Sequence, residues 1–127
     1  MLGLDAVEVA RIKKIIDSGS GQHFLRKVFT PQEITYCTRS GGYRYESLAA
    51  RFAAKESVGK ALGVGIMTEA DLTNIEVVND AKGKPSIVLH EKALALAKAQ
   101  NIAGFAVSLS HAGAMAFAVC QAVPSGK

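Results

Sequence analysis

Residues 45–62 form the strongest helical segment of the chain, and most of it lies in the run RFAAKESVGKALGVG at 51–65. Alanines dominate the segment, and Gly63 and Gly65 follow it as they follow many helix ends. At about 100° per residue, Glu56 and Lys60 fall on one side of this helix, while Arg51 and Lys55 fall nearly opposite. The charges therefore form no single polar stripe.

The segments around this helix alternate between strand and helix patterns. Residues 1–9 predict a strand that is buried on both faces, and hairpins are expected at 74–89, turning through Asp80 and Gly83, and at 104–123, turning around Gly113. Further helices are expected from residue 10 to Gly19, from 30 to about 40, and over 90–101. This order predicts one α+β domain over 1–127, with a mainly antiparallel sheet and a long central helix.

Residues 30–33, TPQE, have the chemistry of a helix start. Thr30 can cap the helix, Pro31 suits the first helical position, and the Glu33 side chain can reach back to the cap. The glycine-rich stretch before this helix, residues 19–22, is expected to be a flexible insertion.

Composition narrows the class of protein. A chain of 127 residues with 49% hydrophobic residues and no low-complexity stretch is expected to fold as one domain. No apolar run approaches the roughly 20 residues of a membrane span, and the N-terminus has no signal-peptide pattern, so we expect a cytoplasmic protein without a membrane partner. Cys37 and Cys120 lack metal-ligand or redox spacing and receive no role.

The net charge of +4 and the pI near 9.2 favour an anionic partner. Nucleic acid, an acidic protein and a phosphorylated cofactor all satisfy that condition. Only 6% of the residues are aromatic, tryptophan is absent and no nucleic-acid reader motif is present, which argues against nucleic acid.

Two acids form a candidate metal site. Strand alternation places Asp5 on the same face as Gly3 and Val7, where a carboxylate needs hydrogen-bond donors, an open cleft or a metal. Asp5 and Glu56 together would suit a magnesium-diphosphate complex, because Mg²⁺ takes one or two carboxylates plus phosphate oxygens and water. By spacing alone, however, Glu56 and Lys60 also fit a surface ion pair four residues apart.

His111 ends the predicted strand FAVSLSH. Alternation groups it with Phe105, Val107 and Leu109, so it fits either a core histidine or a donor to a phosphate. The glycines at 63 and 65 fit either a helix cap or backbone N–H groups for an anion.

Taken together, GLDAVEV, RFAAKESVGKALGVG and VSLSH resemble the motifs of the holo-acyl-carrier-protein synthases, the small phosphopantetheinyl transferases. The resemblance covers nearly the whole chain and includes FTPQEI and NDAKGKP. It implies a transferase of fatty acid biosynthesis and lipid metabolism, with the 4′-phosphopantetheinyl transferase fold. The implied reaction transfers the phosphopantetheine arm of coenzyme A to a serine of apo-acyl carrier protein and releases adenosine 3′,5′-bisphosphate. It also implies a homotrimer with active sites at subunit interfaces.

The resemblance assigns roles by motif. Asp5 and Glu56 would hold Mg²⁺, Lys60 would neutralise the transferring phosphate, and Glu56 would take the serine proton directly or through a metal-bound water. The implied coenzyme A site comprises Arg51, Lys60, Gly63, Gly65, Lys84, Pro85, Ser110 and His111, with Lys84 and Pro85 near the adenine.

The basic first helix gains a purpose from the same resemblance. Carrier proteins are acidic, so Arg11 and Lys14, with Lys13, would dock one, although a solvated face also explains the lysines. A basic residue expected before the long helix falls at Arg44 only if the alignment slips. Two other classes remain to be tested: a nucleic-acid-binding module and an inactive structural trimer.

Overall fold

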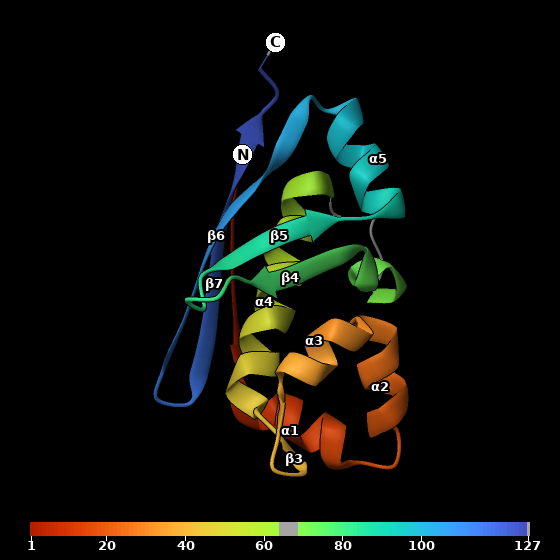
Figure 1. Ribbon diagram of the computed structural model, residues 1–127, viewed down its shortest axis with the longest axis vertical. Helices are drawn as coiled ribbons and strands as arrows, with labels where there is room; N and C mark the ends of the chain where they lie inside the picture. Colours follow the sequence, from red (N-terminus) through yellow and green to blue (C-terminus); the bar gives the residue numbers. More distant parts are fainter. Residues whose placement is uncertain (64–68, 127) are drawn as a thin grey trace.

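The computed structural model describes residues 1–63 and 69–126 (Figure 1). The elements run in the order β1 (Leu2–Glu8), α1 (Val9–Asp17), α2 (Gly21–Val28), α3 (Pro31–Tyr36), β2 (Thr38–Arg39), β3 (Gly42–Tyr43), α4 (Tyr45–Gly63), the 3₁₀ helix η1 (Glu69–Asn74), β4 (Ile75–Asn79), β5 (Pro85–Leu89), α5 (Glu91–Ala99), β6 (Ile102–Ala112) and β7 (Met115–Pro124).

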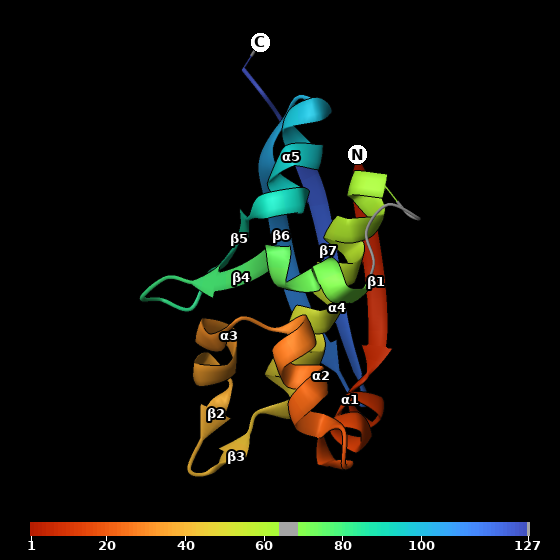
Figure 2. The ribbon, with the colours of Figure 1, turned by 90° about the vertical axis from the view of Figure 1, so that its right-hand side faces the viewer.

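Helix α4 lies between two layers of strands. On one side is a three-stranded antiparallel sheet in the order β1-β7-β6, and on the other is the antiparallel hairpin β4-β5 (Figures 1 and 2). The helices α1, α2 and α3 lie at one end of this assembly, where α1 and α2 pack together, and α5 lies toward the other end. The α+β class, the antiparallel strands and the long central helix are confirmed.

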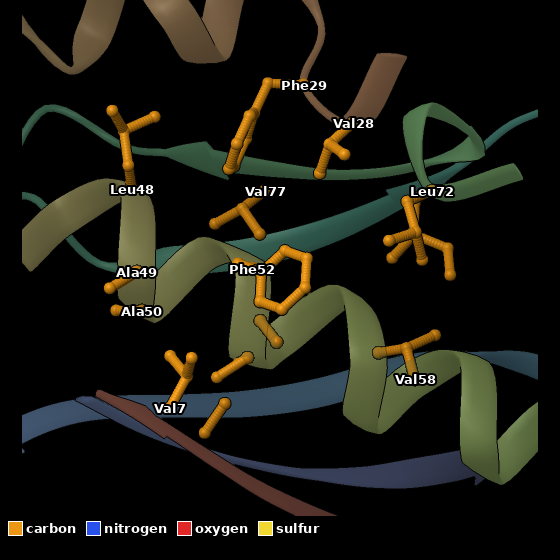
Figure 3. Packing of buried hydrophobic residues seen from close by; sticks show 14 of the residues in the cluster. Val7, Val28, Phe29, Leu48, Ala49, Ala50, Phe52, Val58, Leu72 and Val77 are labelled. Carbon is orange, nitrogen blue, oxygen red and sulfur yellow. The ribbon is translucent and has the colours of Figure 1, made fainter. Parts of the chain in front are cut away.

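Small residues allow α4 to approach both layers. Ala49, Ala53 and Ala54 are fully buried, and Figure 3 shows α4 between Val7 of β1 and Val77 of β4. A Cβ atom at Gly3 would lie 2.4 Å from the Ser57 carbonyl oxygen, so only glycine permits strand and helix to approach this closely at that point.

The predicted hairpins at β4-β5 and β6-β7 are confirmed, and Pro85 opens β5 as expected. The prediction that the first strand is buried on both faces is wrong: Gly3 and Val7 face α4, but Leu2 and Leu4 are 70% and 66% exposed. None of the helices in the described ranges combines the length and apolar character that crossing a bilayer requires.

Residues 19–22, expected to form a flexible insertion, divide between an exposed turn at 19–20 and the first residues of a helix. Helix α2 begins at Gly21, which is buried, and a Cβ atom there would lie 1.8 Å from the Ile16 carbonyl oxygen. The glycine is therefore a close contact between α1 and the start of α2. Sequence reasoning took it as a break because glycine also marks helix ends.

The capping chemistry of TPQE is confirmed, and Glu33 does more than cap. The Thr30 hydroxyl accepts a hydrogen bond from the Glu33 backbone N–H, while Glu33 Oε1 accepts one from the Thr30 backbone N–H. Glu33 Oε2 accepts a further bond from the Val77 backbone N–H at 2.8 Å. One carboxylate thus fixes the start of α3 against β4.

Glu33 also forms a fully buried ion pair with Lys55. Lys55 Nζ lies 2.7 Å from Glu33 Oε1 and 5.5 Å from the centre of the Phe29 ring. It also donates to the carbonyl oxygens of Leu72 at 3.0 Å and Ile75 at 2.5 Å. Burial lowers the pKa of Lys55, and the neighbouring Glu33 carboxylate opposes that shift. The pair joins α4, α3 and the start of β4.

A second polar contact stabilises the same layer. Glu76 Oε2 accepts a hydrogen bond from the Thr30 hydroxyl at 2.8 Å, and Glu76 Oε1 lies 2.9 Å from His90 Nε2. Burial by itself raises the pKa of Glu76, but the bonds with His90 and Thr30 outweigh it, so the pKa is lower than usual. Cys37 and Cys120 are buried free thiols.

We expect Lys55→Met to lower the free energy of unfolding by about 3–5 kcal/mol, because it leaves the Glu33 carboxylate buried without its counter-ion. The double variant Glu33→Gln/Lys55→Met should recover part of that loss. Urea denaturation measures both, with Lys98→Met on the exposed face of α5 as the control. A loss below about 1 kcal/mol for Lys55→Met would contradict the assigned role.

The lowered pKa of Glu76 predicts an acid dependence of stability. Its folded pKa lies below the ordinary 4.5, so the stabilising contribution is present above that pH and is lost as the pH falls through the folded pKa. Glu76→Gln should flatten the decline in unfolding free energy below about pH 4.5, measured by denaturation at several pH values. Glu91→Gln, which removes an exposed carboxylate of α5, is the matched control, and identical slopes for both variants would refute the assignment.

Candidate active site

Asp5 and Lys60 form the first part of the candidate site. Asp5 lies on the face of β1 that packs against α4, and Lys60 Nζ donates to Asp5 Oδ1 at 3.0 Å. The side chains are 19% and 49% exposed, so the pair borders solvent. The partner that a carboxylate on this strand face requires is therefore a lysine ammonium group.

Glu56 lies one helical turn before Lys60 on α4 and is half-buried. Residues four apart on a helix share a face, with Cβ atoms about 6 Å apart. Lys60 pairs with Asp5 and lies one helical turn from Glu56. The meeting of Asp5 and Glu56 at one metal ion stays a prediction. Because Lys60 pairs with Asp5, its ammonium group is not committed to Glu56 alone.

These residues suit a hard, oxygen-seeking cation that draws its other ligands from elsewhere. In residues 1–63 and 69–126 no group of three or more His, Cys, Asp and Glu side chains is placed to hold a metal. Mg²⁺ bound with a diphosphate needs only one or two carboxylates from the protein, because phosphate oxygens and water complete its coordination shell. The donor set therefore fits Mg²⁺ bound together with a phosphorylated ligand.

A cleft of about 500 Å³ forms the second part of the candidate site. It opens between the start of α4, the β2-β3 hairpin, the β4-β5 turn and the end of β6. Its lining includes four of the predicted residues, Arg51, Pro85, Ser110 and His111. Arg39 and Arg44 add further positive charge against one acid, Glu46, so the cleft suits an anion.

Arg51 is the most buried cation of this cleft, with 3% of its surface exposed. Its terminal Nη2 donates to Asn79 Oδ1, and its guanidinium carbon lies 4.4 Å from the centre of the Tyr36 ring. Sequence reasoning missed both neighbours. Their one sequence signal was position, since Tyr36 ends the helix that TPQE begins and Asn79 precedes the Asp80 turn.

His111 is exposed near the end of β6 and lines the cleft, so the alternative of a core histidine is wrong. Strand alternation was correct about its face: His111 pairs with Ala116, which pairs with Val7 on the α4 side of the sheet. The sheet extends past its helical cover at this end, which exposes the ring.

Within one chain, the Asp5–Lys60 pair lies away from the basic cleft. Lys60 follows Arg51 by nine residues, which is about 13 Å along the helix axis. Neither Asp5, Glu56 nor Lys60 lines the cleft. Lys84 is exposed beside Pro85, Gly63 ends α4, and Gly65 lies outside the described residues.

The predicted docking residues lie on α1. Arg11 and Lys14 are exposed, whereas Ile12 and Ile16 are buried, so the helix presents its basic side to solvent. The Tyr45 hydroxyl donates to Asp17 at 2.7 Å and thereby ties the end of α1 to the start of α4. The role of Arg11 and Lys14 in docking stays a prediction.

Comparison with known proteins places the chain in a family. Residues 1–118 match the family model of the 4′-phosphopantetheinyl transferase superfamily. The chain is 47% identical to a holo-[acyl-carrier-protein] synthase of Ruminiclostridium cellulolyticum, over 98% of this chain and 91% of that protein. It is 45% identical to the synthase of Cytophaga hutchinsonii, over 92% and 91%.

Solved structures agree with these relatives. The Helicobacter pylori holo-[acyl-carrier-protein] synthase in complex with coenzyme A is 32% identical with a TM-score of 0.78, covering 96% of this chain and 99% of that one. The Plasmodium yoelii holo-ACP-synthase is 30% identical with a TM-score of 0.82, covering 98% and 94%. The chain therefore belongs to the 4′-phosphopantetheinyl transferase superfamily and, within it, to the enzymes of the holo-[acyl-carrier-protein] synthase family.

Proposed function

We propose that this enzyme transfers the 4′-phosphopantetheine arm of coenzyme A to a serine hydroxyl of apo-acyl carrier protein. In that reaction the serine oxygen bonds to the phosphorus that carries the pantetheine arm, and the bond to adenosine 3′,5′-bisphosphate breaks. The observation that carries the proposal is the 47% identity to a holo-[acyl-carrier-protein] synthase over 98% of the chain. The basic cleft and the Asp5–Lys60 pair support it, since both suit a phosphorylated ligand.

Asp5 and Glu56 are the residues that would hold Mg²⁺. When bound, this cation neutralises the diphosphate of coenzyme A and stabilises the charge that develops on it. The pairing of Lys60 with Asp5 supports the choice of site, because it keeps a partly exposed ammonium group beside one of the two carboxylates. Lys60 can then turn to the transferring phosphate, where positive charge stabilises the transition state.

Glu56 is the residue proposed to receive the serine proton, either directly or through a water molecule. Its place one turn from Lys60 supports this role, because proton acceptor and phosphate-binding cation then share one helix face. Arg51, Ser110 and His111 would contact the phosphates of coenzyme A in the cleft. Lys84 and Pro85, at the end of the β4-β5 turn, would lie near the adenine.

A homotrimer with shared active sites would unite the two parts of the site. No helix or strand of the described residues covers the face of the β1-β7-β6 sheet opposite α4 (Figure 1). This face exposes several apolar side chains. Its exposed fractions are 70% for Leu2, 66% for Leu4, 37% for Phe117, 36% for Val119 and 45% for Val123. An apolar face of this kind favours association with other copies. A neighbouring copy would place its Asp5, Glu56 and Lys60 beside the cleft of the first.

The proposal extends to the setting of the reaction. Exposed Arg11 and Lys14 on α1 would attract an acidic carrier protein and accelerate encounter. We propose that the carrier protein loaded with its phosphopantetheine arm serves fatty acid biosynthesis, and that the enzyme acts in the cytoplasm.

The decisive experiment mixes purified protein, apo-acyl carrier protein, coenzyme A and Mg²⁺, and weighs the carrier by mass spectrometry. We expect the carrier to gain one phosphopantetheine group, and the gain to stop when EDTA removes the cation. Asp5→Asn and Glu56→Gln should each lower kcat/KM by at least about 100-fold, because each removes a proposed cation ligand. Normal transfer by either variant would end the metal assignment.

The same preparations separate the other two classes of protein. Salt-sensitive binding of RNA or DNA in a filter assay, without transfer, would favour a nucleic-acid-binding module. A folded trimer that neither binds coenzyme A nor transfers the arm would favour a structural role.

Subunit association has its own prediction. Val119→Lys places a charge on the apolar sheet face, and we expect the trimer measured by light scattering to dissociate and transfer to fall together. Ala99→Lys, on the exposed side of α5, should leave the mass and the activity unchanged. Full transfer by a monomeric Val119→Lys protein would show that the site does not need a second copy.

A further inference from the structure

Arg51 raises an electrostatic question that the proposed function does not answer. Its guanidinium group is almost fully buried, yet the ion pairs formed between described residues do not include it. Its Nε atom has no hydrogen-bond partner among the described residues. Lys55, one turn further along α4, is also buried but has Glu33 as counter-ion. A buried cation held by neutral groups needs an account of what keeps it there.

Tyr36 is the first of two neutral groups that hold Arg51. The Arg51 guanidinium carbon lies 4.4 Å from the centre of the Tyr36 ring, and that of Arg44 lies 5.2 Å from the same centre. Arg44 Nη1 also donates to the Tyr36 carbonyl oxygen at 3.1 Å. The electron-rich ring attracts both cations, so one residue can keep two like charges at the same cleft.

Asn79 is the second neutral group. Its Oδ1 accepts from Arg51 Nη2, while its Nδ2 donates to the Gly83 carbonyl oxygen at 2.9 Å. The turn that contains Gly83 is itself ordered, because Asp80 Oδ1 accepts from the backbone N–H groups of Lys82 at 2.9 Å and Lys84 at 2.8 Å. Arg51 is therefore tied through Asn79 to the turn that borders the cleft.

We propose that Tyr36 and Asn79 are positioning residues, which hold the Arg51 guanidinium in the orientation that binds the anionic ligand of the cleft. This inference rests on the proposed function, because it takes coenzyme A as that ligand. Tyr36 occupies one face of the guanidinium group and Asn79 occupies Nη2, so Nη1 is the nitrogen left for an incoming phosphate. Orienting the cation before the ligand arrives lowers the conformational cost of binding.

The inference predicts a change in affinity without a matching change in the chemical step. Tyr36→Leu should weaken binding of coenzyme A and of adenosine 3′,5′-bisphosphate, measured by calorimetry, about 5- to 20-fold. Asn79→Ala should weaken both to a similar extent, and kcat should stay within about twofold of wild type. Tyr36→Phe keeps the ring and is the matched control, so its affinity should stay within about twofold of wild type.

A double-mutant cycle with Arg51→Gln tests whether the effect passes through Arg51. If Tyr36 and Asn79 act by orienting the guanidinium group, Tyr36→Leu and Asn79→Ala should each add less than about a twofold loss in the Arg51→Gln background. A general structural role would instead give the full loss in both backgrounds. Circular dichroism and thermal melting identify a variant that does not fold, and Tyr36 and Asn79 then provide independent routes to the same test.

The outcomes separate this inference from the proposed function. Wild-type protein that binds neither coenzyme A nor its bisphosphate product would end both. Wild-type binding combined with unchanged affinity in Tyr36→Leu and Asn79→Ala would overturn the positioning role alone. An undiminished effect in the Arg51→Gln background, or failure of Tyr36→Phe to retain affinity, would overturn it as well.

Discussion

The close packing of α4 between two layers of strands is the constraint on which the rest of the structure depends. It requires small residues at the contacts, including Gly3 against the Ser57 carbonyl and the buried alanines of α4. A helix enclosed in this way can carry charge only where a partner or an opening exists. The polar residues of α4 therefore mark the places where it meets another polar group or solvent.

The charged residues on the two faces of α4 are accommodated differently. Toward β4-β5, Lys55 is neutralised by Glu33 and by carbonyl oxygens, a closed arrangement that joins three elements. Arg51, on the same side, has a neutral amide and an aromatic ring and borders a cleft. Toward β1, Lys60 and Asp5 form a pair that solvent can reach. The fully buried Lys55–Glu33 pair stabilises the fold, whereas Arg51 lines a cleft and Lys60 borders solvent, where a ligand can approach them.

The sequence predicted the features that local chemistry determines. Capping by Thr30 and Glu33, the glycine-containing hairpin turns and the inward side of Asp5 follow from residues close in the chain. The pairing of Lys55 with Glu33 and the stacking of Arg51 on Tyr36 join distant segments, and no spacing rule connects them. Helix α2 was missed because a buried glycine that permits close packing looks, in sequence, like a break.

The distance between the Asp5–Lys60 pair and the basic cleft bears on the role of the exposed apolar sheet face. Asp5 on β1 and Leu109 on β6 both pair with Ala118 of β7, so the two edges of the sheet lie about 10 Å apart. Among the described residues, Asp5 and Lys60 lie outside the lining of the basic cleft. The sheet face opposite α4 exposes apolar side chains, and burying them against another copy would be favourable. In the proposed homotrimer, the association that covers this face would also bring Asp5 and Glu56 of one copy toward the cleft of another, so assembly and a complete site would form together.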